Sequence, residues 1–154
     1  MSKKSTKLLD VIVIGAGASG MMAAITAARR GKSVAILERM NKPGKKILAT
    51  GNGKCNFTNN NMDTSRFHGN IQLIQSVLDR FSKEDTLSFF HEIGIWPKEK
   101  NGYYYPNSGQ AVSVVEAFNH ELNRLHVPVY LEQEVLDLFP DKYGFRIKTV
   151  QTSY

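Results

Sequence analysis

Three glycines with a fixed spacing follow directly on a short run of β-branched residues near the start of the chain. The run covers residues 11–14, and the stretch after it reads Gly15-Ala16-Gly17-Ala18-Ser19-Gly20. Where a strand turns into a helix, the first such glycine allows the bend. The second lets a pyrophosphate approach the backbone, and the third lets helix and strand pack closely. Because the N–H groups at the helix start attract phosphates, the spacing predicts a dinucleotide-binding turn.

An acidic residue stands where such a turn needs one. Residues 21–30 predict a helix and residues 33–37 a second strand, which ends at Glu38. A carboxylate there accepts hydrogen bonds from ribose hydroxyls and disfavours a 2′-phosphate, so NADP is not expected, although Arg39 is adjacent. Gly44 then completes an extended pattern that favours FAD over NAD. An NAD-binding dehydrogenase domain remains the alternative.

The net charge of +6 is concentrated close to this turn. Residues 29–54 carry eight basic residues against the single Glu38 and contain no aromatic residue. Such a cluster suits a compact anion such as a pyrophosphate. A single-stranded nucleic acid platform would interleave aromatic side chains for stacking, so no nucleic acid partner is expected.

A segment rich in glycine and asparagine covers residues 50–61. This composition predicts a loop with unusual backbone angles and no helix or strand. Successive N–H groups of such a loop can face one acceptor-rich ligand, and a flavin ring presents acceptors along its edge. A mobile surface loop is the alternative. The candidate binding residues here are Thr50, Gly51, Asn52, Gly53, Lys54, Cys55 and Asn56, with Lys45 and Lys46 before them.

Two stretches resemble one flavoprotein family. Residues 44–59 resemble the signature GRKLxxSGGGRCNxTN of the BaiN/YhiN-like group, also called the aminoacetone-oxidase-type FAD-binding enzymes. Residues 102–115 resemble its GRxFPxSxxAxSVVxxL stretch. Asn52 replaces the middle glycine of the triple, and Lys45 and Lys54 replace arginines. Lysine keeps the charge but lacks the planar fork that grips phosphate at two points.

The resemblance implies an α/β fold, a Rossmann-like FAD/NAD(P)-binding domain of the glutathione-reductase-like two-dinucleotide-binding type. Residues 9–154 would be its N-terminal part, incomplete at the C-terminus, after a flexible basic start at residues 1–8. Family members continue into a substrate domain, so the sequence names no substrate. The resemblance also implies that Val135 lies beside the adenine, and that hydride passes through flavin N5 to or from a small organic molecule, with NAD(P)H as a co-substrate.

No catalytic side chain is assigned from the sequence. Lys54, Cys55 and Asn56 are candidates for positions near the flavin ring. One cysteine excludes a redox-active dithiol, and Cys55 is either a thiol of lowered pKa or a packing residue under the ring. The four histidines have no metal-ligand spacing, so no metal is expected. The tyrosines at 103–105 either line a substrate pocket or pack alternately in a strand.

The rest of the sequence predicts ordinary elements. We expect helices over residues 70–81 and 82–93, a hairpin turning at residues 101–102, and a long helix capped by Asn107 or Ser108. A strand over residues 127–134 and a hairpin turning at residues 141–144 follow. No apolar run is long enough to cross a membrane, and a cytoplasmic location is expected. An unpaired sheet edge would favour self-association. A truncated, redox-inactive nucleotide-binding module is a further alternative.

Overall fold

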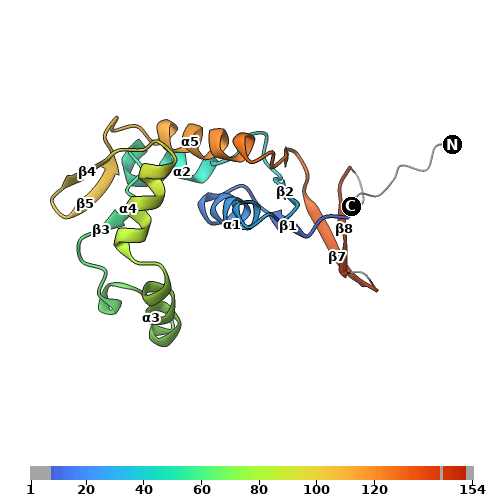
Figure 1. The fold of residues 1–154 in the computed structure, drawn as a ribbon, viewed down its shortest axis with the longest axis horizontal. Helices are drawn as coiled ribbons and strands as arrows, with labels where there is room; N and C mark the ends of the chain where they lie inside the picture. The colour runs from blue at the N-terminus through green and yellow to red at the C-terminus, as the bar shows by residue number, and fades with distance from the viewer. Residues whose placement is uncertain (1–7, 143, 152–154) are drawn as a thin grey trace. The chain divides into compact units, whose positions relative to one another are not determined.

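The structure is a computed structural model that describes residues 8–142 and 144–151 (Figure 1). The chain divides into two units, one made of Met1–Lys45 with Phe118–Tyr154 and the other of Lys46–Ala117. Helix α5 (Ala111–Arg124) runs from the second unit into the first. Apart from Leu8, the flexible start predicted at residues 1–8 lies outside the described residues.

A parallel sheet forms the centre of the first unit. Its strands are β1 (Val11–Ile14), β2 (Val34–Leu37) and β6 (Val129–Tyr130), in the order β1-β2-β6. All four residues of β2 are buried, as expected for a central parallel strand. Helix α1 (Ala18–Arg29) connects β1 to β2 and packs on both strands (Figure 1). Among the described strands, β1 and β6 are the outer ones, and self-association through such an edge stays a prediction.

The predicted strand over residues 127–134 is wrong in length. Only Val129–Tyr130 pair with β2, because Glu132 takes a φ of 57° and the chain turns there. Strands β7 (Val135–Asp141) and β8 (Gly144–Thr149) then form an antiparallel hairpin, which confirms the turn expected at residues 141–144.

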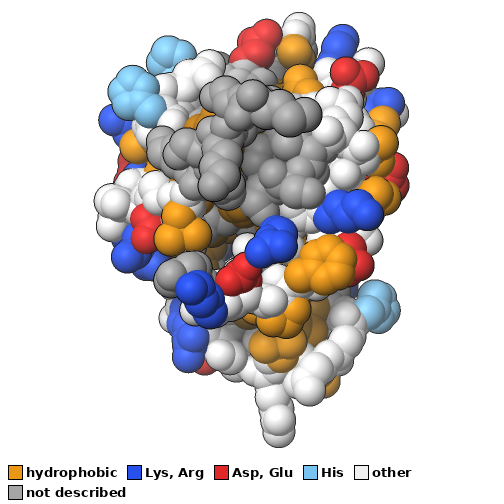
Figure 2. Space-filling view, turned by 90° about the vertical axis from the view of Figure 1, so that its right-hand side faces the viewer, with side chains coloured by type: hydrophobic (Ala, Val, Ile, Leu, Met, Phe, Trp, Pro, Cys, Tyr) orange, Lys and Arg blue, Asp and Glu red, His pale blue; other side chains and the backbone are white. Residues whose placement is uncertain are grey.

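The hairpin exposes apolar side chains. Phe145 is 73% exposed and Leu136 57% exposed. Figure 2 shows apolar and charged side chains interspersed on the face that it presents. Two-stranded hairpins bury little surface of their own, so β7 and β8 add little to the core.

A small antiparallel sheet with helices forms the second unit. Its strands are β3 (Thr58–Asn59), β5 (Tyr103–Pro106) and β4 (Pro97–Lys100), in that order. Asn101 and Gly102 have φ values of 54° and 85°, which confirms the predicted tight hairpin turn. The expectation of no regular structure over residues 50–61 is wrong in part. A 3₁₀-helix η1 (Thr50–Gly53) and β3 lie there, after a short helix α2 (Lys45–Ala49).

The predicted helix starts in this unit are mostly confirmed. After the 3₁₀ turn η2 (Thr64–Arg66), Asn70 caps α3 (Ile71–Arg80) by accepting from the N–H of Leu73 at 3.0 Å. Ser82 and Asp85 form a capping box on α4 (Lys83–Glu92). The predicted cap of the long helix is wrong: α5 begins at Ala111, and Ser108 accepts instead from the N–H of Gln110, before the helix.

Replacing Ser82 tests this capping box. Ser82→Ala removes the hydroxyl that accepts from the N–H of Asp85, so the free energy of unfolding should fall by about 1 kcal/mol. Urea unfolding followed by circular dichroism measures the change. Ser88→Ala, in the interior of the same helix, is the matched control and should leave stability nearly unchanged. Equal effects of the two substitutions would contradict the capping role.

Candidate dinucleotide-binding site

The glycine turn has the geometry that the spacing predicts. Gly15 has a φ of 98°, and its N–H donates to the carbonyl of Leu37 at 2.7 Å. A Cβ on Gly20 would lie 2.0 Å from the carbonyl oxygen of Gly15, so only glycine permits this approach of α1. A Cβ on Gly17 would meet no atom within 4 Å. The space in front of Gly17 is therefore open to a ligand.

The start of α1 is the part of this turn suited to phosphate. Gly17 is the N-cap residue of α1, and no side chain caps the helix there. The first turn also contains no acidic residue that would repel an anion. Ala18 and Ser19 lie exposed at this end. Small side chains, uncapped amides and the helix dipole together make an anion-binding end.

Glu38 is fixed against the glycine turn. Its side chain is buried, with the residue 8% exposed. One carboxylate oxygen accepts from the N–H of Ala16 at 2.6 Å, and the other accepts from the N–H of Met40 at 2.8 Å. Each oxygen has a further lone pair that a ribose hydroxyl can use. The backbone N–H of Glu38 also donates to Tyr130, which orients the residue from the neighbouring strand.

The second glycine of the extended pattern joins the same turn. The N–H of Gly44 donates to the carbonyl of Ala16 at 2.8 Å. Gly44 is buried with a φ of 67°, a conformation that favours glycine. Ala16 thus binds Glu38 through its N–H and Gly44 through its carbonyl. We call Ala16, Glu38 and Gly44 the Ala16 assembly.

Val135 is the first residue of β7, and it follows two residues that hydrogen-bond to the segment holding Glu38. The N–H of Gln133 donates to the carbonyl of Glu38 at 2.8 Å, and Glu132 makes a similar bond to Met40. Val135 is half-buried. The strand that contains it therefore leaves from beside Glu38. Its contact with an adenine stays a prediction.

Sequence reasoning missed a buried polar chain next to this segment. The Thr149 hydroxyl donates to the side-chain oxygen of Gln133 at 2.8 Å, and the Gln133 amide donates to Gln151 at 2.9 Å. Gln133 and Thr149 are both buried. These bonds tie the base of the β7–β8 hairpin to the segment that holds Glu38. No sequence motif marks them, because the partners are distant in the chain.

The loop in the second unit has the unusual backbone angles expected from its composition. Gly51, Asn52, Gly53 and Cys55 have φ values of 54°, 54°, 78° and 57°. Asparagine tolerates the left-handed region better than most residues, which explains why Asn52 can stand for the middle glycine of the signature. A Cβ on Gly51 would lie 2.5 Å from the backbone nitrogen of Asn56. Gly51 is therefore required by close approach as well as by φ.

Side chains of the loop divide into anchored and exposed ones. Thr50 donates to the carbonyl of Ile47 at 2.7 Å, and the Asn56 amide donates to the carbonyls of Thr58 and Tyr104, both at 3.2 Å. Asn56 therefore holds the loop on the small sheet, whereas Thr50 ties the start of the loop to α2. Other predicted binding residues have exposed side chains: Arg39, Lys45, Lys46, Asn52 and Lys54.

Cys55 is a packing residue. It is 6% exposed, and burial raises the pKa of its thiol. A raised pKa keeps the thiol protonated, and this contradicts the alternative of a reactive thiol with a lowered pKa. Lys54 beside it is exposed and does not offset the burial.

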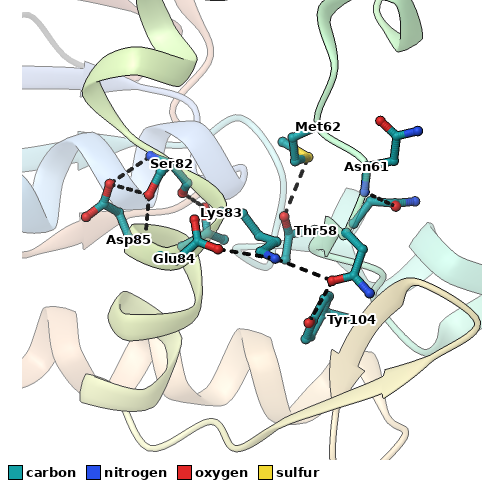
Figure 3. A network of polar contacts seen from close by, with 11 residues as sticks. Thr58, Asn61, Met62, Ser82, Lys83, Glu84, Asp85 and Tyr104 are labelled. Atoms are coloured by element: carbon teal, nitrogen blue, oxygen red, sulfur yellow. Dashed lines mark hydrogen bonds and ion pairs between the residues drawn. The ribbon is translucent and has the colours of Figure 1, made fainter.

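A polar network orders the segment after β3 (Figure 3). The side-chain oxygen of Asn60 accepts from the Tyr104 hydroxyl at 2.9 Å and from the Lys83 ammonium at 3.4 Å. Lys83 also pairs with Glu84 at 3.2 Å. The Thr58 hydroxyl points to the sulfur of Met62. The network therefore links the start of α4 to the face of the small sheet that carries Tyr104.

Ion pairs to a buried glutamate connect the last residue of α1 to helix α5. Glu121 of α5 is 5% exposed and binds Arg29 of α1 at 2.8 Å and Arg124 at 2.7 Å. The hydrogen bond from Arg124, aided by Arg29, lowers the pKa of Glu121 to about 2. Because the pKa is lowered in the folded state, the stabilisation is complete above pH 4.5 and is lost as the pH falls toward 2.

Glu121→Gln tests this contribution. We expect a lower free energy of unfolding at neutral pH and a weaker fall in stability between pH 4.5 and 2 than in the unmodified chain. Urea unfolding across that pH range measures both effects. Glu116→Gln, an exposed glutamate on the same helix, is the control and should change neither. An unaltered pH profile in Glu121→Gln would contradict the assignment.

The part of the chain that the structure describes contains neither a cluster of metal-ligating side chains nor a helix suited to crossing a membrane. No three His, Cys, Asp or Glu side chains there lie close enough together to hold a metal ion. None of the described helices combines the length and the apolar character that a membrane crossing requires.

Comparison with known proteins gives the same class of fold as the geometry of the glycine turn. A family described as "HI0933-like protein Rossmann domain" matches residues 9–154. The chain belongs to this family. It is 46% identical over 139 residues to the 3-dehydro-bile acid delta(4,6)-reductase of Clostridium scindens, covering 88% of this chain and 34% of that protein. It is 33% identical over 140 residues to the ribosomal RNA dihydrouridine synthase of Escherichia coli, covering 90% and 35%. The chain thus spans about a third of the length of these relatives.

Solved structures support the fold. The 3-ketosteroid-delta4-(5alpha)-dehydrogenase from Rhodococcus jostii RHA1 matches with a TM-score of 0.69 at 15% identity, covering 97% of this chain and 44% of that one. The thioredoxin reductase from Streptococcus pyogenes MGAS5005 matches with a TM-score of 0.51 at 20% identity, covering 95% and 32%. These likenesses confirm the Rossmann-like class.

Family membership decides between the predicted cofactors. The predicted resemblance to BaiN/YhiN-like flavoproteins and the predicted Rossmann-like fold are confirmed. FAD is the cofactor of this family, as the sequence predicts. The individual binding residues and the domain limits stay predictions.

Proposed function

We propose that this chain binds FAD as the flavin-binding part of an oxidoreductase. The Ala16 assembly carries the proposal, because one residue fixes both the ribose-binding carboxylate and the second glycine of the extended pattern. The first unit would hold the adenosine diphosphate portion through Gly17, the start of α1 and Glu38. The loop at residues 50–56 would supply contacts to the flavin portion.

The substrate class follows from what the relatives' names share. A 3-dehydro-bile acid with delta(4,6) double bonds and the uracil ring of uridine both carry a carbon–carbon double bond conjugated with a carbonyl group. We propose a ring compound with such a double bond as the substrate of the protein. When bound, FAD reduced by NAD(P)H would supply the hydride for this reduction, and a proton from solvent would complete the saturated product.

A uridine in RNA is the second candidate substrate, supported by the relatives named for ribosomal RNA. The higher identity to the bile acid reductase favours a small molecule. The basic stretch at residues 29–54, which lacks aromatic residues, favours it too.

The absorbance spectrum of the purified chain tests FAD binding. We expect a flavin band, with FAD identified after heat release. Gly17→Val should give a colourless protein of unchanged circular dichroism, because its side chain fills the open space in front of the turn. A wild-type chain that takes up no FAD on incubation would contradict the proposal.

Reoxidation of the reduced flavin tests the substrate class. The FAD-loaded chain is photoreduced without oxygen and mixed with a 4-en-3-one steroid, with the saturated ketone as the control. We expect faster reoxidation by the conjugated compound. Reoxidation only by a uridine-containing oligoribonucleotide would favour the second candidate, and equal rates with both ketones would contradict the first.

A further inference from the structure

A buried amide side chain joins the segment that holds Glu38 to the β7–β8 hairpin, and all of these residues belong to the first unit. The backbone N–H of Gln133 donates to the carbonyl of Glu38 at 2.8 Å. Its side-chain oxygen accepts from the Thr149 hydroxyl at 2.8 Å. Gln133 is 8% exposed and Thr149 is 4% exposed, so water has little access to this bond. One residue thus connects the end of β8 to the backbone of Glu38.

Further bonds hold Gln133 in this place. Its side-chain NH₂ group donates to the side-chain oxygen of Gln151 at 2.9 Å, and the Gln151 amide donates to the carbonyl of Glu132 at 3.2 Å. Glu132 has a φ of 57°, and its N–H donates to the carbonyl of Met40 at 3.2 Å. A positive φ is uncommon for glutamate and persists where the surrounding bonds hold it. The turn at residues 132–133 is therefore bonded to the hairpin through side chains and to residues 38–40 through its N–H groups.

The turn at residues 132–133 supports the carboxylate that would bind ribose. Both oxygens of Glu38 accept from backbone N–H groups, so their direction depends on the backbone of residues 38–40. That backbone in turn accepts bonds from residues 132–133. Removal of the Thr149 hydroxyl would leave the buried oxygen of Gln133 without this donor, and a buried acceptor without a donor is costly. The Gln133 side chain would then turn toward another donor and move the backbone that holds Glu38.

We propose that Thr149, acting through Gln133, is a positioning residue that aims the Glu38 carboxylate at the ribose hydroxyls of the adenosine portion. This inference rests on the proposed binding of FAD. A positioning role changes how much the ribose hydroxyls contribute to binding. A role in folding alone would weaken the binding of nucleotides with and without these hydroxyls by the same factor.

Two nucleotides that differ only at the ribose separate these roles. ADP has both ribose hydroxyls and 2′,3′-dideoxy-ADP has neither, so the ratio of their Kd values measures the preference for a hydroxylated ribose. Thr149→Val keeps the shape of the side chain without the hydroxyl, and Thr149→Ser keeps the hydroxyl. Thr26→Val is the matched control, because its hydroxyl donates within α1 to the carbonyl of Met22 at 2.8 Å. Gln151→Ala, which changes an exposed residue bonded to Gln133, is the second variant should Thr149→Val not fold.

Isothermal titration calorimetry of the whole chain measures both Kd values. We expect the preference for ADP to fall about fivefold in Thr149→Val, which is the loss of roughly one hydrogen bond, and to fall less in Gln151→Ala. Thr149→Ser and Thr26→Val should keep the wild-type preference. An unchanged preference in Thr149→Val, or in Gln151→Ala where only that variant folds, would overturn this inference and leave FAD binding intact.

Two further results would also count against it. A fall of equal size in Thr26→Val, or a wild-type chain that binds FAD but does not prefer ADP to 2′,3′-dideoxy-ADP, would overturn the inference alone. A wild-type chain that binds no FAD would contradict the proposed function together with the inference.

Discussion

Gly20→Ala should abolish FAD binding and lower the free energy of unfolding by about 3 kcal/mol. The added Cβ would lie 2.0 Å from the carbonyl oxygen of Gly15 and 3.3 Å from a methyl group of Val13. A backbone carbonyl cannot rotate away as a flexible side chain can. Helix α1 must therefore move off β1, and this displaces the N–H groups that would face the phosphates.

Urea unfolding and FAD titration measure the two effects of Gly20→Ala. Gly17→Ala is the matched control, because its Cβ would meet no atom and its φ of −78° suits any residue. We expect near wild-type stability in this control with weaker FAD binding, since the methyl group enters the ligand space. Wild-type stability and affinity in Gly20→Ala would contradict the close packing of α1 on the turn.

Glu38→Gln should weaken FAD binding tenfold or more and also destabilise the chain. The new NH₂ group of glutamine would face the N–H of either Ala16 or Met40, leaving a buried donor without an acceptor. Such a loss costs about 1–3 kcal/mol, and 1.4 kcal/mol corresponds to a factor of ten in affinity. The ribose hydroxyls would lose a charged acceptor at the same time.

Equilibrium titration with FAD and thermal unfolding measure this change. Glu134→Gln serves as the control. This exposed glutamate follows the same segment, and among the described residues only its backbone carbonyl forms a hydrogen bond, with the N–H of Val150. We expect no change there. Full FAD affinity in Glu38→Gln would show that the carboxylate serves the fold alone.

Local signals in the sequence predicted the elements that position the site. The bend at Gly15, the open space at Gly17 and the tight packing at Gly20 each depend on residues close in the chain. The same holds for the cap at Asn70 and for the hairpin turn at residues 101–102. Such features are readable because one residue type satisfies a local geometric need.

Contacts between distant residues were not predictable from one sequence. Glu121 lies far from Arg29 in the chain, and nothing in either residue names the other. Gln133 and Thr149 look like ordinary polar residues until the hairpin brings them together. Strand β6 ends earlier than its apolar sequence predicts. Glu132 has a positive φ and its N–H donates to the carbonyl of Met40, so the chain turns away from the strand direction there.

The role of Glu38 shows the same limit within the site. Its place after the second strand predicted a ribose contact, but its two bonds to the N–H groups of Ala16 and Met40 came only with the structure. The carboxylate therefore shapes the glycine turn before any ligand binds. Preorganisation of this kind lowers the cost of binding.

Hydrogen exchange measured by mass spectrometry, with and without FAD, tests the central claim most directly. The account predicts that FAD slows amide exchange in peptides covering residues 15–20 and 38–44, where the Ala16 assembly lies, and in residues 50–56. NAD at the same concentration should protect less. Protection by FAD that leaves residues 15–20 and 38–44 unchanged would contradict the claim that the Ala16 assembly binds the cofactor.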